Sequence, residues 1–239
     1  MGVMGSPRAS GGSTSQTAAR LLIILDKLGE ASSAADLAEF PDAVKVIRAT
    51  SRLAKLDFWL RNPDYLADEV LTDIVAGDID PKEGLPHVER MLAGSTPLLH
   101  LYPMQRYKYG AWELPDNAIA VLKSYGFVAQ RRAKEVDTEA ASQARRDYFL
   151  LTDGERAVAN MRAQVEQIEW YDQQADSIKL LNLGPSGAAA KSRQYCQPEY
   201  KATPVGRIIA PILERVRLRF AEVAAACAYT IAAPAGDTP

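Results

Sequence analysis

The residues with the clearest chemical potential are four arginines that stand in two adjacent pairs. Arg131–Arg132 follows the short apolar stretch 127–130, and Arg145–Arg146 precedes a second one, 148–151. Two such stretches around a polar tip are typical of a β-hairpin. Residues 131–146 contain five positive and three negative side chains, a net charge of +2. This modest basic patch predicts contact with an anion, and backbone phosphates of a nucleic acid are the first candidate.

A helix immediately before the hairpin extends the candidate site. "PDNAIAVLKSYG" buries Ile119 and Leu122 and ends at Gly126, a residue suited to a C-terminal cap. The helix carries few of the Arg and Gln side chains that read base edges best, which favours nonspecific contact. The alternative is an ordinary solvated face balanced by acidic residues at the tip. The candidate nucleic-acid-binding residues are Arg131, Arg132, Lys134, Arg145, Arg146, Asn117, Lys123 and Ser124.

Catalytic and metal chemistry find little support in the sequence. His87 and His100 are the only histidines, and no Cys or His stands near them at metal-ligand spacing. The segment "GPSGAAAKS" resembles a phosphate-binding loop only superficially, because Ala190 stands where that motif needs glycine. We therefore expect a protein that is not an enzyme, with no catalytic residues, no metal and no cofactor.

Composition places the chain among folded proteins of the cytoplasm. Its 239 residues are 47% hydrophobic, enough to bury a core, and the net charge of -2 still permits a local basic patch. Two cysteines are too few for a disulfide scaffold and suit a reducing compartment. No apolar run is long enough for a membrane span, so we expect no membrane association. Residues 1–16 are rich in Gly and Ser and predict a disordered tail.

The first half of the chain predicts mostly helices. Apolar spacing indicates a helix from Thr17 to Gly29, and Ser33 with Asp36 indicates a capped short one. A longer helix is expected from Asp42 to Arg61. We interpret residues 63–114 as an insertion before the helix that leads into the hairpin.

The second half predicts long helices. Thr152 and Glu155 have capping-box spacing, and the apolar positions that follow form a narrow seam suited to a partner helix. The seam residues are Val158, Met161, Val165 and Ile168. Residues 181–204 predict a linker or long loop, and 205–230 a C-terminal helix rich in arginine. Pairing of this basic helix with the acidic residues of the seam helix could be intrachain or could build a dimer or partner interface.

The order of a helix ending in "LKSYGFV", a strand pair and a helix opening with "LLTDGERAV" resembles the second half of a winged helix-turn-helix domain. The resemblance implies a mainly α fold with a β-hairpin wing. The domain would span residues 17–180, with the inserted segment 63–114 before its third helix.

A second resemblance covers more of the chain. "AARLLIILDKLG" and "RATSRLAKLDFWLRNPDYLADEVL", followed by the wing, are similar to middle components of bacterial ABC-three-component systems. This resemblance implies a non-enzymatic accessory subunit that docks on an SMC-like or Rad50-like ATPase, helps it engage double-stranded DNA, and serves in defence against phage or plasmid DNA. The alternative is a dimeric winged-helix transcriptional regulator.

Overall fold

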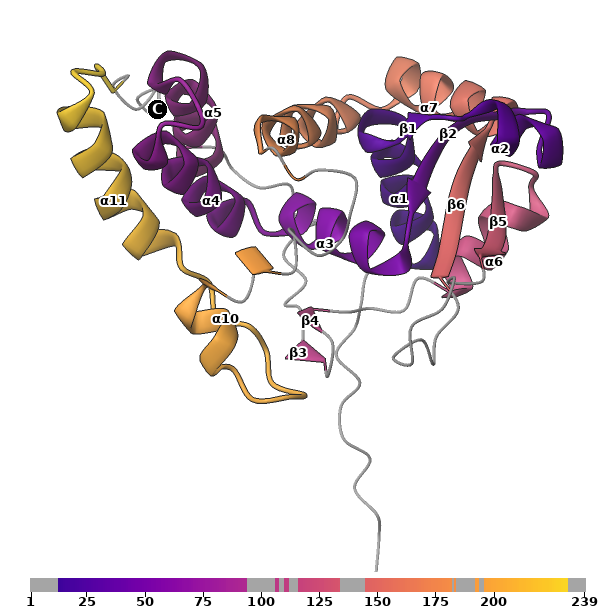
Figure 1. Ribbon diagram of the computed structural model, residues 1–239. Coiled ribbons are helices and arrows are strands. Elements are labelled where there is room, and N and C mark those ends of the chain that lie inside the picture. The colour runs from indigo at the N-terminus through magenta and orange to yellow at the C-terminus, as the bar shows by residue number, and fades with distance from the viewer. Residues whose placement is uncertain are drawn as a thin grey trace, which may run out of the picture.

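In the computed structural model the chain is mainly α-helical with a β-hairpin, as expected (Figure 1). The hairpin belongs to a four-stranded antiparallel sheet that was not expected. The structure describes residues 13–93, 106–107, 110–111, 116–133, 145–181, 183, 192–193 and 196–231. Most of the expected disordered tail, Lys134 and the hairpin tip lie outside these ranges. Within them, no helix has the length and apolar character that a membrane crossing requires.

The helices are α1 Thr14–Leu28, α2 Ala34–Glu39, α3 Thr50–Arg61, α4 Pro63–Ala76, α5 Pro81–Ala93, α6 Asp116–Ser124, α7 Thr152–Gln164, α8 Ile168–Leu180, α10 Pro198–Ala202 and α11 Leu213–Ala226. The strands are β1 Glu30–Ala31, β2 Ala43–Arg48, β3 Arg106–Tyr107, β4 Gly110–Ala111, β5 Val128–Ala133 and β6 Arg145–Leu151.

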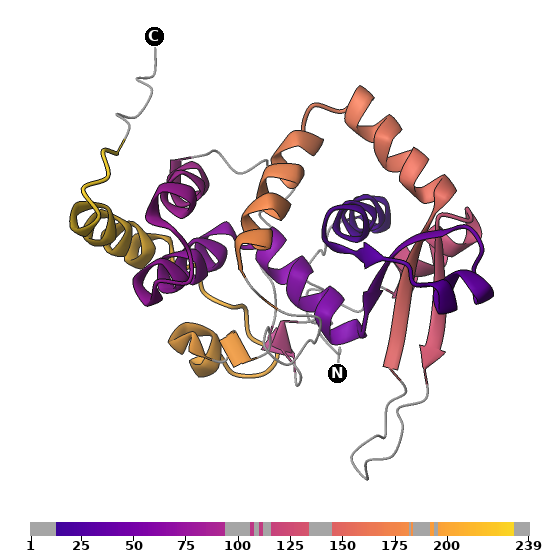
Figure 2. The same cartoon turned by 45° about the horizontal axis from the view of Figure 1, so that its top comes forward.

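Helix α1 is the centre of the fold. Figure 2 shows it nearly end-on, enclosed by α3, α7, α8 and the sheet. Every residue from Leu21 to Leu25 is buried. These five residues are apolar on all sides of the helix, and such a helix is stable only when it is enclosed by other elements. Ser13 and Gln16 form a capping box that fixes its first turn.

The sheet has the strand order β1-β2-β6-β5, and its two faces are covered by different helices. Because side chains alternate along a strand, Ile47, Tyr148 and Leu150 face the main core around α1. Val46 and Phe149 face the opposite side and form a small second core. Phe40, the residue that ends α2, lies against Phe149 with ring centroids 4.9 Å apart.

The helix expected from Asp42 to Arg61 is wrong in its first third. Residues 43–48 form β2, which pairs with β6, and α3 begins only at Thr50. The segment "AVKVIR" contains three β-branched residues, and the long-range pairing with β6 decides its conformation. The capping box at Ser33 and Asp36 is confirmed.

The expected long seam helix is two helices. Helix α7 ends at Gln164, α8 begins at Ile168, and Val165 lies at the break with 41% exposure. Val158 and Ile168 are buried and Met161 packs against the same core, so most of the seam is satisfied inside this chain. The expected capping box also fails, because the Thr152 hydroxyl donates to the Asp42 carbonyl instead of capping α7.

The C-terminal helix also differs from the expectation. It begins at Leu213 instead of residue 205, and the expected linker 181–204 contains α10. Two arginines of α11 make intrachain ion pairs with α4 instead of with the acidic residues of the seam. Arg215 and Arg219 lie 3.3 and 2.6 Å from the buried Asp68.

A polar contact holds α5 against α8 and makes the fold sensitive to pH. Arg90 donates to His87 Nδ1 at 3.1 Å and to the buried Ser177 hydroxyl at 2.8 Å. His87 Nδ1 also lies 2.9 Å from the Ser177 hydroxyl. Burial, and then the charge of Arg90, lower the pKa of His87 below its ordinary value.

We predict that the free energy of unfolding falls as the pH falls below the ordinary histidine pKa of about 6.5. Because the pKa of His87 is lowered in the folded state, the unfolded chain binds the proton more readily. The contribution of His87 to the free energy of unfolding is therefore complete above that pH and is lost below it. The variant His87→Asn keeps a hydrogen-bonding group at this position but does not titrate. Urea denaturation at two pH values should show a loss of about 1 kcal/mol in the wild type that is smaller in the variant. Equal losses in both proteins would contradict the prediction.

Candidate nucleic-acid interface

Helix α6 and the β5–β6 hairpin form one continuous surface. Ala118, Ile119 and Leu122 bury the inner face of α6 against the core. Gly126 has a φ of +71° and ends the helix as expected, and the Phe127 N–H donates to the Leu122 carbonyl at 3.0 Å. The turn at Gly126 leads directly into β5.

The outer face of α6 holds three of the sequence-predicted residues. Asn117, Lys123 and Ser124 are all exposed. The Ser124 hydroxyl donates to the Val121 carbonyl at 2.7 Å, so it is partly engaged by its own helix. Lys123 is therefore the one cation that the outer face of α6 offers.

The hairpin separates the arginines onto opposite faces of the sheet. Arg131 is the register partner of Asp147, whereas Arg132 is the register partner of Arg146. Neighbouring residues of a strand point to opposite faces, so the four arginines do not form one patch. The structure describes the backbone of Arg145 but not its side chain.

Arg131 is engaged by residues of its own chain, although the sequence predicts that it contacts an external anion. Its guanidinium lies 2.8 Å from Asp36, 3.1 Å from Asp147 and 3.2 Å from Glu39, and its side chain is 23% exposed. It also lies over the ring of Phe149, 4.9 Å from the centroid. These contacts fasten β5 to α2 and to β6.

Arg131 shares the two buried carboxylates with a second arginine. Arg48 Nη2 lies 2.7 Å from Asp36, and Arg48 Nη1 lies 3.5 Å from Asp147. The hydrogen bond from Arg48 holds the pKa of the Asp36 carboxyl well below its ordinary value, and those from Ser33 and Arg131 act in the same direction against the effect of burial. Asp36 therefore stays charged, and each of the two buried aspartates is paired with both arginines.

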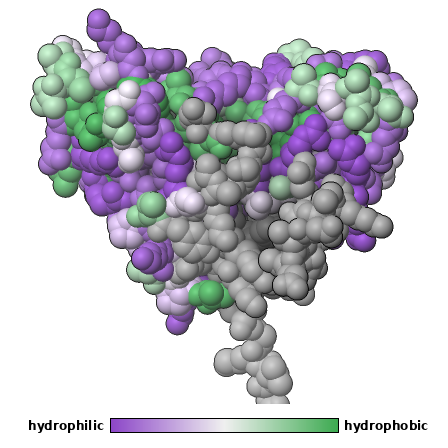
Figure 3. Space-filling view, in the orientation of Figure 1, coloured by the Kyte–Doolittle hydropathy of each residue, from purple (hydrophilic) through white to green (hydrophobic). Residues whose placement is uncertain are grey.

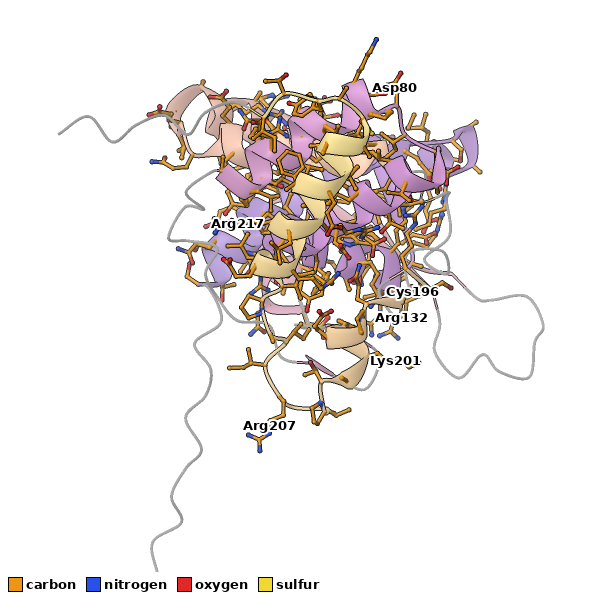
Figure 4. The ribbon with its side chains drawn as sticks, turned by 90° about the vertical axis from the view of Figure 1, so that its left-hand side faces the viewer. Asp80, Arg132, Cys196, Lys201, Arg207 and Arg217 are labelled. Atoms are coloured by element: carbon orange, nitrogen blue, oxygen red, sulfur yellow. The ribbon has the colours of Figure 1, made fainter. Side chains whose placement is uncertain are left out.

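Arg132 and Arg146 lie on the other face, next to the first turn of α6. Arg146 is 35% exposed and lies 3.6 Å from Asp116, the first residue of α6. Arg132 is exposed and has no ion pair among the residues that the structure describes. Figure 4 labels Arg132 in the lower half of the view. Because like charges directly opposite in a sheet are destabilising, this pair is suited to receive an anion.

Sequence reasoning missed two residues of this surface. Asp116 balances part of the charge of Arg146, and Tyr125 exposes its ring at the other end of α6. The signal for Tyr125 was its place just before the glycine that ends the helix. Within the described part of the chain, no group of three His, Cys, Asp or Glu side chains could hold a metal ion.

Comparison with known proteins gives no match to a protein-family model, to a curated protein or to a solved structure. Functional inference therefore depends on the geometry of this surface and on the two resemblances in the sequence.

We predict that Arg131→Ala and Arg132→Ala, neighbours on one strand, have different effects on stability. Removal of Arg131 leaves Asp36 and Asp147 buried with one arginine fewer, which should cost about 1–3 kcal/mol. Removal of Arg132 should change the free energy of unfolding by no more than about 0.5 kcal/mol. Urea denaturation of both variants measures the difference. Similar effects in the two would show that Arg131 does not hold the sheet to α2.

Proposed function

We propose that the surface formed by α6 and the β5–β6 hairpin binds the phosphate backbone of double-stranded DNA, with Arg132 and Arg146 as its principal cations. The observation that carries this proposal is the placement of these two arginines as register partners beside α6. Cross-strand partners have Cα atoms about 4.5–5.5 Å apart, so both guanidiniums can reach one phosphate group or two successive ones. A bound anion would offset the repulsion between them.

The order of the elements supports a winged-helix interpretation. Helices α1, α3 and α6 precede the hairpin, β2 pairs with β6 in the order β2-β6-β5, and residues 63–115 stand between α3 and α6. In such a domain α6 would be the third helix and the hairpin the wing. The pair β1–α2 departs from the simple pattern, because α2 covers the face of the sheet that turns away from α1.

The side chains favour contact with the backbone over the reading of bases. The outer face of α6 offers Asn117, Lys123 and Ser124, and the acidic Asp116 stands at its start. None of these is the bidentate arginine or glutamine that discriminates base pairs best. This supports a nonspecific DNA-contacting subunit over a sequence-specific transcriptional regulator.

We propose further that the chain is a non-enzymatic accessory subunit of an SMC-like ATPase, in line with its resemblance to the middle components of ABC-three-component systems. Its sequence offers a DNA-contact surface and lacks the Gly-Lys pair of a nucleotide-binding loop. Most of the α7–α8 seam is buried within the chain, so a partner would need another surface. Exposed hydrophobic side chains include Val75 on α4 and Leu218 on α11, and Figure 3 shows hydrophobic residues at the upper left, where α5 and α11 lie.

We predict that the double variant Arg132→Glu/Arg146→Glu binds duplex DNA more weakly than the wild type. Loss of two phosphate contacts should reduce the slope of log K against log salt by about two. Fluorescence anisotropy of a labelled duplex at several salt concentrations measures this slope.

A matched control for this titration is Arg156→Glu on α7, whose exposed arginine pairs only with its helical neighbour Asp153 among the described residues. It makes the same change of charge per residue and should leave the slope unaltered. An unchanged slope in the double variant would exclude the hairpin as the DNA contact.

We predict that the chain alone sediments near its monomer mass of 26.1 kDa and forms a larger complex with an SMC-like ATPase encoded beside it. The physical reason is that its helices already bury their apolar faces against one another within the chain. Analytical ultracentrifugation of the chain with and without the ATPase distinguishes the outcomes. A homodimer in the absence of the ATPase would favour the regulator, and a monomer that ignores the ATPase would exclude the subunit role.

A further inference from the structure

Tyr125 is the only aromatic side chain that lies largely in solvent among those whose burial the structure describes, with an exposure of 68%. The other aromatic side chains of that set are buried or half-buried. A large ring exposed to water contributes little hydrophobic free energy to folding, so its exposed position indicates a role other than stabilising the fold.

The ring is held in a fixed position at the end of the candidate interface. The Tyr125 N–H donates to the Val121 carbonyl at 3.2 Å, which keeps the residue on the last turn of α6, directly after Lys123 and Ser124. Its ring stacks on that of Phe127, with centroids 5.6 Å apart and planes inclined by 20°. Phe127 in turn packs against the main core. One face of Tyr125 is therefore supported by Phe127.

A supported ring with its other face in solvent is suited to stack on a nucleobase. Base stacking on aromatic side chains tolerates any base, because every base has a π-face. The bases inside a duplex have both faces covered by their neighbours, so only an unpaired or terminal base can use such a ring. Lys123, two residues before Tyr125, can meet the adjoining phosphate.

We infer that Tyr125 is a stacking platform for an unpaired base and that this surface takes a junction between duplex and single-stranded nucleic acid. The inference rests on the proposed function of the hairpin arginines. From Phe127 to Arg132 the strand advances five residues, about 17 Å, which equals the rise of about five base pairs. The arginines would hold the phosphates of the duplex while Tyr125 holds a base beyond its end.

The test compares a blunt duplex with the same duplex carrying a short single-stranded overhang that contains 2-aminopurine. We expect the wild type to bind the overhang substrate more tightly and to quench its 2-aminopurine fluorescence, because stacking quenches this base. Tyr125→Ala and Tyr125→Leu should each lose about tenfold in affinity for the overhang substrate and abolish the quenching, while affinity for the blunt duplex stays unchanged. Tyr125→Phe keeps the π-face and should behave as the wild type.

The remaining outcomes separate the two proposals. If the wild type binds neither substrate, the proposed function fails. If it binds both and Tyr125→Ala changes nothing, the arginine surface stands and the stacking role is overturned, in favour of Tyr125 as a protein contact. A preference for the overhang that survives in Tyr125→Ala overturns the stacking role as well.

Discussion

A carboxylate removed from water must be met by a cation, and the architecture of this protein depends on that constraint. Charged groups in a protein interior are tolerated only when they are paired and hydrogen-bonded. In four ion-pair clusters among the described residues, a buried aspartate on one element is bound by arginine or lysine from another, so each of these clusters also joins elements distant in sequence. The clusters are Asp36 and Asp147 with Arg48 and Arg131, Asp57 with Arg20 and Arg61, Asp26 with Lys45 and Arg162, and Asp68 with Arg215 and Arg219.

This constraint explains why arginine alone is an ambiguous sign of function in this chain. Arg131 and Arg132 are adjacent in the sequence, yet one fastens α2 to the sheet and the other reaches solvent beside α6. Strand alternation predicts that they point to opposite faces. What the sequence could not show is that α2 covers one of those faces and brings Asp36 to it. The hairpin itself was therefore predicted correctly, but the different environments of its arginines follow only from the tertiary packing.

Elements that depend on local sequence could be predicted, whereas elements that depend on long-range contacts could not. The hairpin, the capped α2 and the glycine at the end of α6 were predictable, because each depends on residues a few positions apart. Strand β2 was mistaken for helix because its conformation depends on pairing with β6, about a hundred residues later. The partner of α11 was missed for a related reason. Basic residues in a sequence indicate that an acidic surface exists, but not which helix carries it.

The pairing of α11 with α4 also has a consequence for the synthesis of the chain. Asp68 and Arg215 are separated by 147 residues. At the usual rates of translation, α4 therefore leaves the ribosome about 7–30 s before the helix that neutralises it. During that time its acidic residues and the apolar surface beneath α11 stay uncovered, so the nascent chain exposes a surface that the finished protein buries. A ribosome that stops before residue 213 would release a chain with that surface permanently open.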